Sequence, residues 1–253
     1  DQDKWELYNL EEDWSQSKNL ADEYPEKLKE LIDAWFVEAK KNNVLPLDDR
    51  VAVEILGTPR PSDEPPRDTY NYYPDTEPVP EGVAVNVRGR SYKILANVEI
   101  TNQSEGVIFA HGSRFGGHAL FIKDHKLYYV YNFLGIAPEQ VFTSDVALKP
   151  GTYTLGMEFE KTGAGEHGES LGETKLYIDD KVVASGTMRT QPGKFTLSGD
   201  GLCVGYDSGD AVSSLYKAPA KFTGGTIQGV GVTVKGEPYV NLEAEAKRIM
   251  MKH

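Results

Sequence analysis

Cysteine and basic residues are scarce in this sequence, and each shortage excludes a class of protein. Cys203 is the single cysteine among 253 residues, so neither an intrachain disulfide nor a zinc site built from several thiolates can form. The 27 Lys and Arg residues are outnumbered by 39 Asp and Glu, which gives a formal net charge of -12. Proteins that bind nucleic acid use Lys and Arg to displace counterions from phosphates, and no basic stripe occurs here. We therefore expect no nucleic-acid partner.

Long apolar runs and a leader are also missing. No apolar stretch approaches the roughly 20 residues that cross a bilayer, and the acidity does not favour binding at a membrane surface. The composition predicts a soluble chain without a membrane partner. No cationic and apolar leader precedes the predicted fold, and the chain begins with Asp1 rather than Met. We expect either that a leader has been removed or that the chain is a piece of a longer one.

Residues 106–134 carry the longest strand, turn and strand pattern in the chain. Asp124-His125 stands where a hairpin would turn, and each flanking segment places its bulky residues at alternate positions. These residues are Val107, Phe109 and His111 before the turn, and Leu127, Tyr129 and Tyr131 after it. One apolar face of such a sheet must be covered by a second sheet.

Further candidate strands follow at short, regular intervals and supply that second sheet. They cover residues 83–89, 92–100, 141–148, 152–160, 174–179, 182–187, 201–207 and 222–234. The pattern predicts a mostly β protein, an antiparallel β-sandwich over residues 82–253 with about eleven strands. Asn241 is a candidate cap for a short helix at the C-terminal end of this domain.

Residues 1–43 predict a small α+β segment. Residues 5–10 alternate like a short strand that has no partner strand before it. Residues 25–41 predict a helix, because Pro25 suits its first turn and apolar residues recur every three or four positions. The apolar stripe consists of Leu28, Leu31, Ile32, Trp35 and Ala39. Because six preceding residues cannot cover this stripe, we expect it to pack on a larger body or to self-associate through residues 5–40.

Residues 44–81 hold eight of the 14 prolines and predict an extended linker docked on the sandwich. Residues 51–56 are the only candidate strand within it. Tyr70, Tyr72 and Tyr73 are interpreted as anchors that hold the linker to the sandwich, in preference to an exposed patch for stacking a ligand.

Two blocks of the sequence resemble one enzyme family. Residues 5–36, WELYNLEEDWSQSKNLADEYPEKLKELIDAWF, look like the C-terminal subdomain of type I sulfatases. Residues 112–135, GSRFGGHALFIKDHKLYYVYNFLG, with NVLPLDDR, YYP, VGYDSGDAVSSLY and KFTGGTI, resemble the concanavalin-like extension of bacterial arylsulfatases. The chain departs from the family at Asp13-Trp14, at His118, where Tyr is usual, and at the turns Asp124-His125 and Asp179-Asp180, where Asp-Gly is usual.

The resemblance implies a concanavalin-like, jelly-roll sandwich that forms the non-catalytic C-terminal part of an arylsulfatase from a bacterial cytoplasm or periplasm. Such enzymes hydrolyse sulfate esters with a formylglycine made from Cys or Ser, two residues before Pro and four before Arg, beside a calcium ion. Cys203 lacks that Pro and Arg, and no serine has the motif. The catalytic domain is therefore the implied partner, calcium belongs to that domain, and no catalytic, cofactor or metal residue is expected here. Asp48-Asp49-Arg50 is interpreted as a salt-bridged segment.

Few other residues suggest chemistry. His111, His118 and His125 recur every seven residues, and this spacing predicts no shared face in a β region. Arg114 and His118 flank Gly116-Gly117 and could contact an anion at a domain interface.

Two alternative functions stay open, a free-standing carbohydrate-binding sandwich and a glycosidase. Glu158 and Glu160 could serve a glycosidase as acid and base, but a solvated strand face is preferred because the Glu-x-Asp-x-x-Glu signature is missing. The Gly-rich loop over residues 163–172 precedes a strand rather than a helix, and it is interpreted as a flexible connection.

Overall fold

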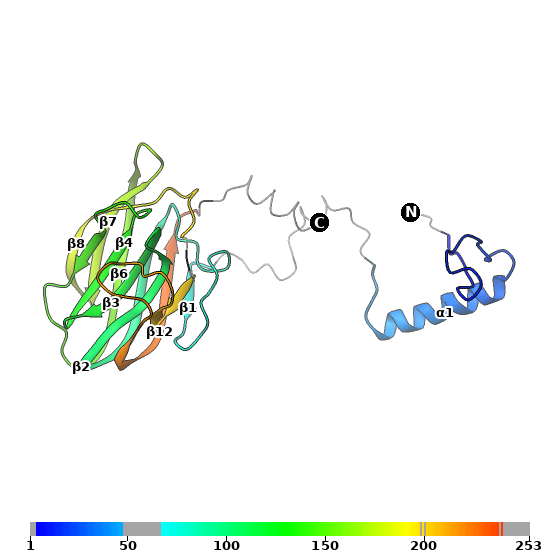
Figure 1. Ribbon diagram of the computed structural model, residues 1–253, viewed down its shortest axis with the longest axis horizontal. Coiled ribbons are helices and arrows are strands. Elements are labelled where there is room, and N and C mark those ends of the chain that lie inside the picture. The colour runs from blue at the N-terminus through cyan, green and yellow to red at the C-terminus, as the bar shows by residue number, and fades with distance from the viewer. Residues whose placement is uncertain (1–3, 48–66, 198, 200, 238, 240–253) are drawn as a thin grey trace. The chain divides into compact units, whose positions relative to one another are not determined.

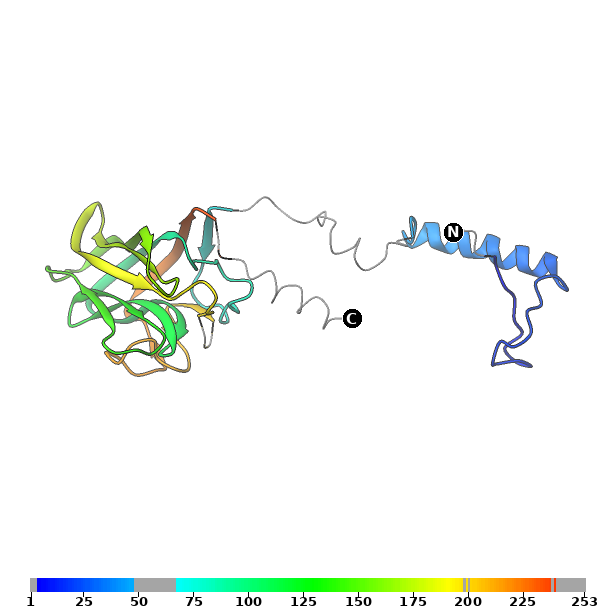
Figure 2. The ribbon, with the colours of Figure 1, turned by 90° about the horizontal axis from the view of Figure 1, so that it is seen from above.

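The structure, a computed structural model, describes residues 4–47, 67–197, 199, 201–237 and 239 (Figures 1 and 2). The chain divides into two compact units, Asp1–Glu64 and Pro65–His253, and each is described by itself. The strand predicted over residues 51–56, the segment Asp48-Asp49-Arg50 and the C-terminal helix lie outside the described residues. No helix of the described residues is long and apolar enough to cross a membrane.

The helix of the first unit has the predicted bounds. Helix α1 spans Pro25–Lys41, with Pro25 in its first turn, Glu26 at the positive end of the helix dipole, and two lysines in its last turn. Within this unit the aromatic ring of Trp5 lies edge-on to Trp35, with centroids 5.7 Å apart. In the apolar stripe Leu31 remains 45% exposed, and Phe36 outside the stripe is 47% exposed, so the apolar side chains of α1 are incompletely covered. Self-association through residues 5–40 stays a prediction.

The strand predicted over residues 5–10 is wrong. This segment has no regular structure, and its backbone meets the chain that follows, where Leu20 donates an N–H hydrogen bond to the Leu7 carbonyl. A strand needs a neighbouring strand for its backbone groups, and the described part of this unit supplies none. Alternation of side chains alone does not make a strand.

The second unit is built from twelve strands among the described residues. They are β1 Thr69–Tyr72, β2 Ser91–Ser113, β3 Gly116–Lys123, β4 Lys126–Asn132, β5 Gln140–Thr143, β6 Gly151–Ala164, β7 Ser170–Ile178, β8 Lys181–Thr190, β9 Leu202–Val204, β10 Tyr206–Asp207, β11 Ala220–Lys221 and β12 Thr223–Lys235. The predicted turns join two of the hairpins. Asp124 and His125 both have positive φ, 50° and 60°, which matches the twist of the strands they connect.

Two antiparallel sheets face each other, and the long strand β2 belongs to both. Its first half, Ser91–Ile100, pairs with β12 and β6 in a first sheet ordered β1-β12-β2-β6-β7-β8. Its second half, Gly106–Ser113, pairs with β9 and β3 in a second sheet ordered β9-β2-β3-β4-β5. The two layers are visible in Figure 2. This mostly β, antiparallel sandwich confirms the predicted fold class at that level.

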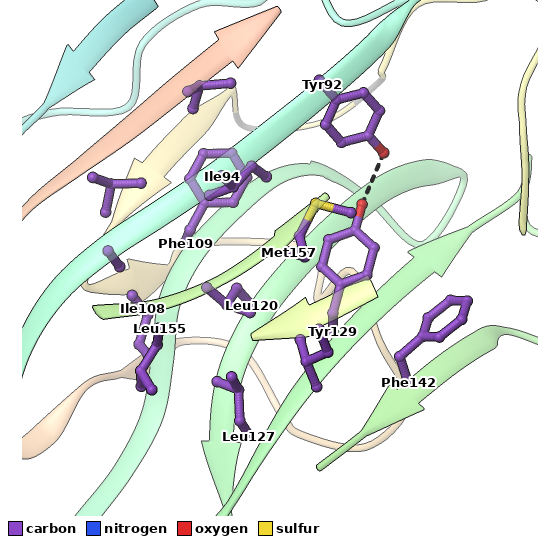
Figure 3. Close-up of a cluster of buried hydrophobic side chains, with 14 of the residues drawn as sticks. Tyr92, Ile94, Ile108, Phe109, Leu120, Leu127, Tyr129, Phe142, Leu155 and Met157 are labelled. Carbon is purple, nitrogen blue, oxygen red and sulfur yellow. Dashed lines mark hydrogen bonds between the residues drawn. The ribbon is translucent and has the colours of Figure 1, made fainter. Parts of the chain in front are cut away.

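The core lies between the two sheets (Figure 3). Among its fully buried members, Phe109 comes from β2, Tyr129 from β4 and Met157 from β6, so both sheets contribute. The hydroxyls of Tyr92 and Tyr129 share a hydrogen bond of 2.9 Å, which satisfies two polar atoms that burial would otherwise penalise.

A β-bulge changes the predicted face of one residue. The β2–β3 register shifts between Val107 and Phe109, so Ile108 and Phe109 both enter the core. Val107 then faces the opposite side of the second sheet, where it packs with Ala110. The prediction that Val107 shares a face with Phe109 and His111 is therefore wrong, because the extra residue reverses the alternation.

A loop covers the outer face of the second sheet. Val212 is fully buried there, and Leu215 and Tyr216 pack beside it against apolar residues of β2, β3 and β4. The short pair β10–β11 closes the base of this loop. The second sheet is therefore covered on both faces. Its outer cover, the loop after β10, is held in place by these apolar contacts and by the β10–β11 pair.

Part of the predicted linker belongs to the sheet itself. Strand β1 pairs with β12, and Tyr70 and Tyr72 pack against the core while the Tyr72 hydroxyl accepts a hydrogen bond from the Val85 amide at 2.9 Å. Tyr73 is 60% exposed. The anchoring role is thus confirmed for Tyr70 and Tyr72 only. Residues 83–89, predicted as a strand, form turns and irregular chain that still bury Val85 and Val87.

Candidate functional site

The structure separates the two predicted anion contacts. Arg114 lies in the turn between β2 and β3 with 63% of its side chain exposed, whereas His118 on β3 is completely buried. The Nδ1 atom of His118 is 3.0 Å from the Tyr129 hydroxyl in the core. His118 is therefore corrected from a surface contact to a core residue, because its position in β3 points its side chain between the sheets. Arg114 remains accessible.

His111 and His118 share a face, contrary to the prediction from their spacing. They stand opposite each other across β2 and β3, with ring centroids 5.8 Å apart. The tight turn at Arg114-Phe115 sets this pairing, and the spacing rule for one continuous strand does not apply across a turn. His125 is exposed in the next turn. No group of three His, Cys, Asp or Glu side chains suited to a metal ion occurs among the described residues.

Burial keeps this histidine pair neutral. Desolvation lowers the pKa of His111 to about 4, with a smaller contribution from the positive charge of Arg88. Desolvation also holds the pKa of His118 well below its ordinary value, and His111 adds to that effect. Both nitrogens of His111 and Nε2 of His118 lack a hydrogen-bond partner among the described residues. The pair is a part of the core that protonation would destabilise, and it is not accessible to a ligand.

Glu158 and Glu160 lie on the outward face of the first sheet. Glu158 is opposite Lys93 on β2, and its carboxylate accepts a hydrogen bond of 2.9 Å from the Tyr177 hydroxyl. The Lys93 Nζ atom is 3.9 Å from the same carboxylate. Both carboxylates therefore lie on the face of a strand and not in a cleft, as the sequence predicted.

A wide hollow lies where the β2–β3 turn meets two loops. We call it the loop cleft; it has a volume of about 840 Å³. Its lining comes from the β2–β3 turn, the segment between β4 and β5, and the loop after β10. The lining residues are Arg114, Phe115, Asn132, Gly135, Ile136, Ala137, Glu139, Gly209, Asp210, Ala211, Ser213, Ser214, Tyr216, Lys217 and Ala218.

Buried polar groups hold one wall of the loop cleft. Asp207 is 2% exposed and accepts hydrogen bonds from the Val212 amide at 3.0 Å and the Tyr216 hydroxyl at 2.5 Å. Burial first, and then the charge of Asp207, raise the pKa of Tyr216 far above its ordinary value. Glu139 fixes the same loop from the other side, because it accepts from the Ser213 hydroxyl at 2.6 Å and the Ser214 amide at 2.8 Å. The wall is therefore formed before any ligand arrives.

The opposite wall presents an aromatic ring with a cation beside it. Phe115 is 56% exposed, and the Arg114 guanidinium lies 4.8 Å from the centre of its ring. The Arg114 Nε atom is 3.7 Å from an Asp210 carboxylate oxygen across the cleft. Sequence reasoning identified Arg114 but missed Phe115 and Asp210. The signal available in the sequence was an aromatic residue, Phe115, placed between Arg114 and Gly116-Gly117.

No family model matches the chain, and no curated protein does. Solved structures give weak similarities. Mouse laminin alpha1 chain domains LG4-5 have 16% identity and a TM-score of 0.45, over 65% of this chain and 41% of that one. The receptor-binding domain of botulinum neurotoxin type G has 11% identity and a TM-score of 0.35, over 64% and 38%. Caenorhabditis elegans galectin LEC-6 has 10% identity and a TM-score of 0.34, over 66% and 96%. This chain therefore spans about two fifths of the laminin and toxin chains.

Proposed function

We propose that this chain is a non-catalytic binding module that takes up a saccharide in the loop cleft. The observation that carries the proposal is the exposed ring of Phe115, braced by Arg114, in a wide cleft whose other wall is pre-formed and polar. A sugar ring has an apolar face that packs on an aromatic ring and hydroxyls that hydrogen-bond to polar groups around it. Pre-formed walls lower the entropy cost of binding.

Hydrolysis of that saccharide is less well supported. A glycosidase needs two carboxyl groups that face the same bond, one as acid and one as base or nucleophile. The two carboxylates that line the loop cleft are Glu139 and Asp210. Glu139 uses both oxygens to hold Ser213 and Ser214, and Asp210 pairs with Arg114. Both carboxylates thus already have partners within the protein.

Removing the Phe115 ring should abolish most of the binding. We expect Phe115→Ala to weaken saccharide affinity about tenfold, because an aromatic packing contact contributes about 0.5–1.5 kcal/mol beyond the area that it buries. A glycan array identifies the ligand, and isothermal titration calorimetry then compares the variants. Phe195→Ala is the matched control, since Phe195 is 43% exposed with Lys194 over its ring at 5.3 Å but lies outside the loop cleft. Equal affinities for all three proteins, or no sugar bound by the parent chain, would contradict the proposal.

A second candidate is that the chain completes an arylsulfatase as its C-terminal part. The observation that favours it is the group of exposed apolar side chains on α1, because Leu31 of the stripe and Phe36 and Val37 beside it offer an apolar surface that another body could cover. In this role the first unit would pack on a sulfatase catalytic domain, which would bring the calcium ion and the formylglycine. Without that partner, the same surface would join two copies of this chain.

Partner binding through this surface should depend on its two large half-exposed side chains. The chain alone is expected to show no turnover of an aryl sulfate with calcium, whereas it should bind a type I sulfatase catalytic domain that lacks its own C-terminal subdomain. Leu31→Ser with Phe36→Ser should weaken that binding at least tenfold, because each apolar side chain contributes about 1.5–3 kcal/mol when fully buried. Light scattering and pull-down measure the association. Turnover by the chain alone, or binding unchanged in the double variant, contradicts this candidate.

A further inference from the structure

Some polar groups of the loop cleft already have hydrogen-bond partners within the protein, and others do not. Among its acceptors, the Glu139 carboxylate binds Ser213 and Ser214, and the Asn132 side chain accepts from the Gly135 amide at 3.0 Å while donating to the Val212 carbonyl at 3.0 Å. The Tyr216 hydroxyl donates to Asp207. These groups already have partners within the protein, so they have little capacity left for a ligand.

The two cations of the cleft have N–H groups that make no hydrogen bond within the described residues. Lys217 makes no hydrogen bond or ion pair with any residue that the structure describes, and it is exposed. Arg114 approaches Asp210 only at 3.7 Å from Nε, which is longer than a hydrogen bond. The contact with the Phe115 ring restrains the Arg114 guanidinium at one side of the cleft, so its terminal N–H groups are held near a ligand that packs on that ring. The cleft thus holds two cations, Arg114 and Lys217, and two carboxylates, Asp210 and Glu139, and the hydrogen-bond donors left for a ligand belong to the two cations.

The negative net charge of the chain limits how many anionic groups a ligand of the loop cleft can carry. The formal net charge is -12, and no basic stripe continues from the cleft along the sequence. A polyanion would gain the two cations of the cleft but would meet the carboxylates of Asp210 and Glu139 beside them and an excess of carboxylates in the rest of the chain. A ligand with one anionic group gains the local contacts, and the overall charge repels it much less.

Resting on the proposed saccharide function, we infer that the loop cleft selects a sugar that carries a single anionic group. Arg114 and Lys217 bind the anion, and Phe115 packs against the apolar face of the same sugar unit or its neighbour. The chemistry of the anion is a carboxylate or a sulfate ester, both of which accept charged hydrogen bonds from a guanidinium. Binding needs no metal ion and no covalent step.

The test uses the full chain and one oligosaccharide backbone in four forms: neutral, with one uronate carboxylate, with one sulfate, and fully sulfated. We expect either monoanionic form to bind at least tenfold more tightly than the neutral form, and the fully sulfated form to gain nothing further. Arg114→Gln should lower the affinity for both monoanionic forms at least tenfold and so remove the preference, and Lys217→Gln should reduce the preference. Lys194→Gln, a lysine outside the cleft, is the control.

The outcomes separate this inference from the proposed function. Equal binding of neutral and monoanionic forms, both lost in Phe115→Ala, would overturn the anion preference and leave the saccharide site standing. Affinity that rises steadily with every added sulfate would also overturn it, because the site would then be a general polyanion surface. Binding of inorganic sulfate as strongly as of the sugar, with no effect of Phe115→Ala, would overturn both proposals. The preference of carboxylate over sulfate, or the reverse, identifies the anion.

Discussion

Lowering the pH from 7 to 4.5 should destabilise the sandwich by about 2.5 kcal/mol through His111 alone. The pKa of this buried imidazole is about 4 in the folded chain, against 6.5 for an ordinary histidine. Between these two pH values His111 is protonated in the unfolded chain and neutral in the folded chain, so the free energy of unfolding falls as the pH drops below 6.5. Above pH 6.5 both states are neutral there, and His111 contributes no pH dependence. His118 acts in the same direction.

Urea unfolding at several pH values measures this loss. His111→Leu should flatten the fall between pH 6.5 and 4.5, and at pH 7 it should cost little, because it removes two buried nitrogens that lack partners. His125→Asn is the matched control, since His125 lies exposed in a turn at φ 60° that asparagine tolerates. If His111→Leu keeps the full acid sensitivity of the parent chain while His125→Asn loses it, the buried histidine is not the cause.

The elements that sequence reasoning predicted correctly are those with a local signal. The helix begins at Pro25 and ends at Lys41 because proline, charge placement and a period of three to four residues agree. The turn at Asp124-His125 follows in the same way from two residues that accept positive φ between alternating strands. In both places the local preference and the tertiary structure favour the same conformation.

The failures occur where the conformation depends on a distant part of the chain. Residues 5–10 alternate like a strand but find no neighbour among the described residues, and the bulge at Ile108 is fixed by pairing with β3. The meeting of His111 and His118 depends on the register across the turn. Alternation within one segment contains no information about register between segments.

The loop cleft could be predicted only in part, for the same reason. Arg114 was noted because two glycines follow it closely. The wall opposite is formed by Asp207 and the loop that it holds, and this loop has neither a helical nor a strand period. Its shape comes from buried hydrogen bonds between residues five and nine positions apart. Such bonds are not evident from residue spacing.

Asp207→Ala should therefore be among the most damaging single changes in the loop cleft. The substitution leaves the buried Val212 amide and the Tyr216 hydroxyl without their acceptor. Each buried group that loses its partner costs about 1–3 kcal/mol, so we expect a loss of about 3 kcal/mol in the free energy of unfolding. Saccharide affinity should fall at least tenfold even at temperatures where the variant is fully folded, because the wall of the cleft loses its position.

Thermal unfolding, calorimetric titration and hydrogen exchange of the Val212 amide measure these effects together. In Asp207→Ala that amide should exchange much faster, while amides of the core strands exchange as in the parent once the lower global stability is allowed for. Asp210→Ala is the control for stability, because its carboxylate is half exposed in the same loop, and we expect a change within about 0.5 kcal/mol. If Asp207→Ala binds saccharide as well as the parent and protects the Val212 amide equally, then the loop does not depend on this carboxylate. The pre-formed wall on which the saccharide site rests would then need another cause.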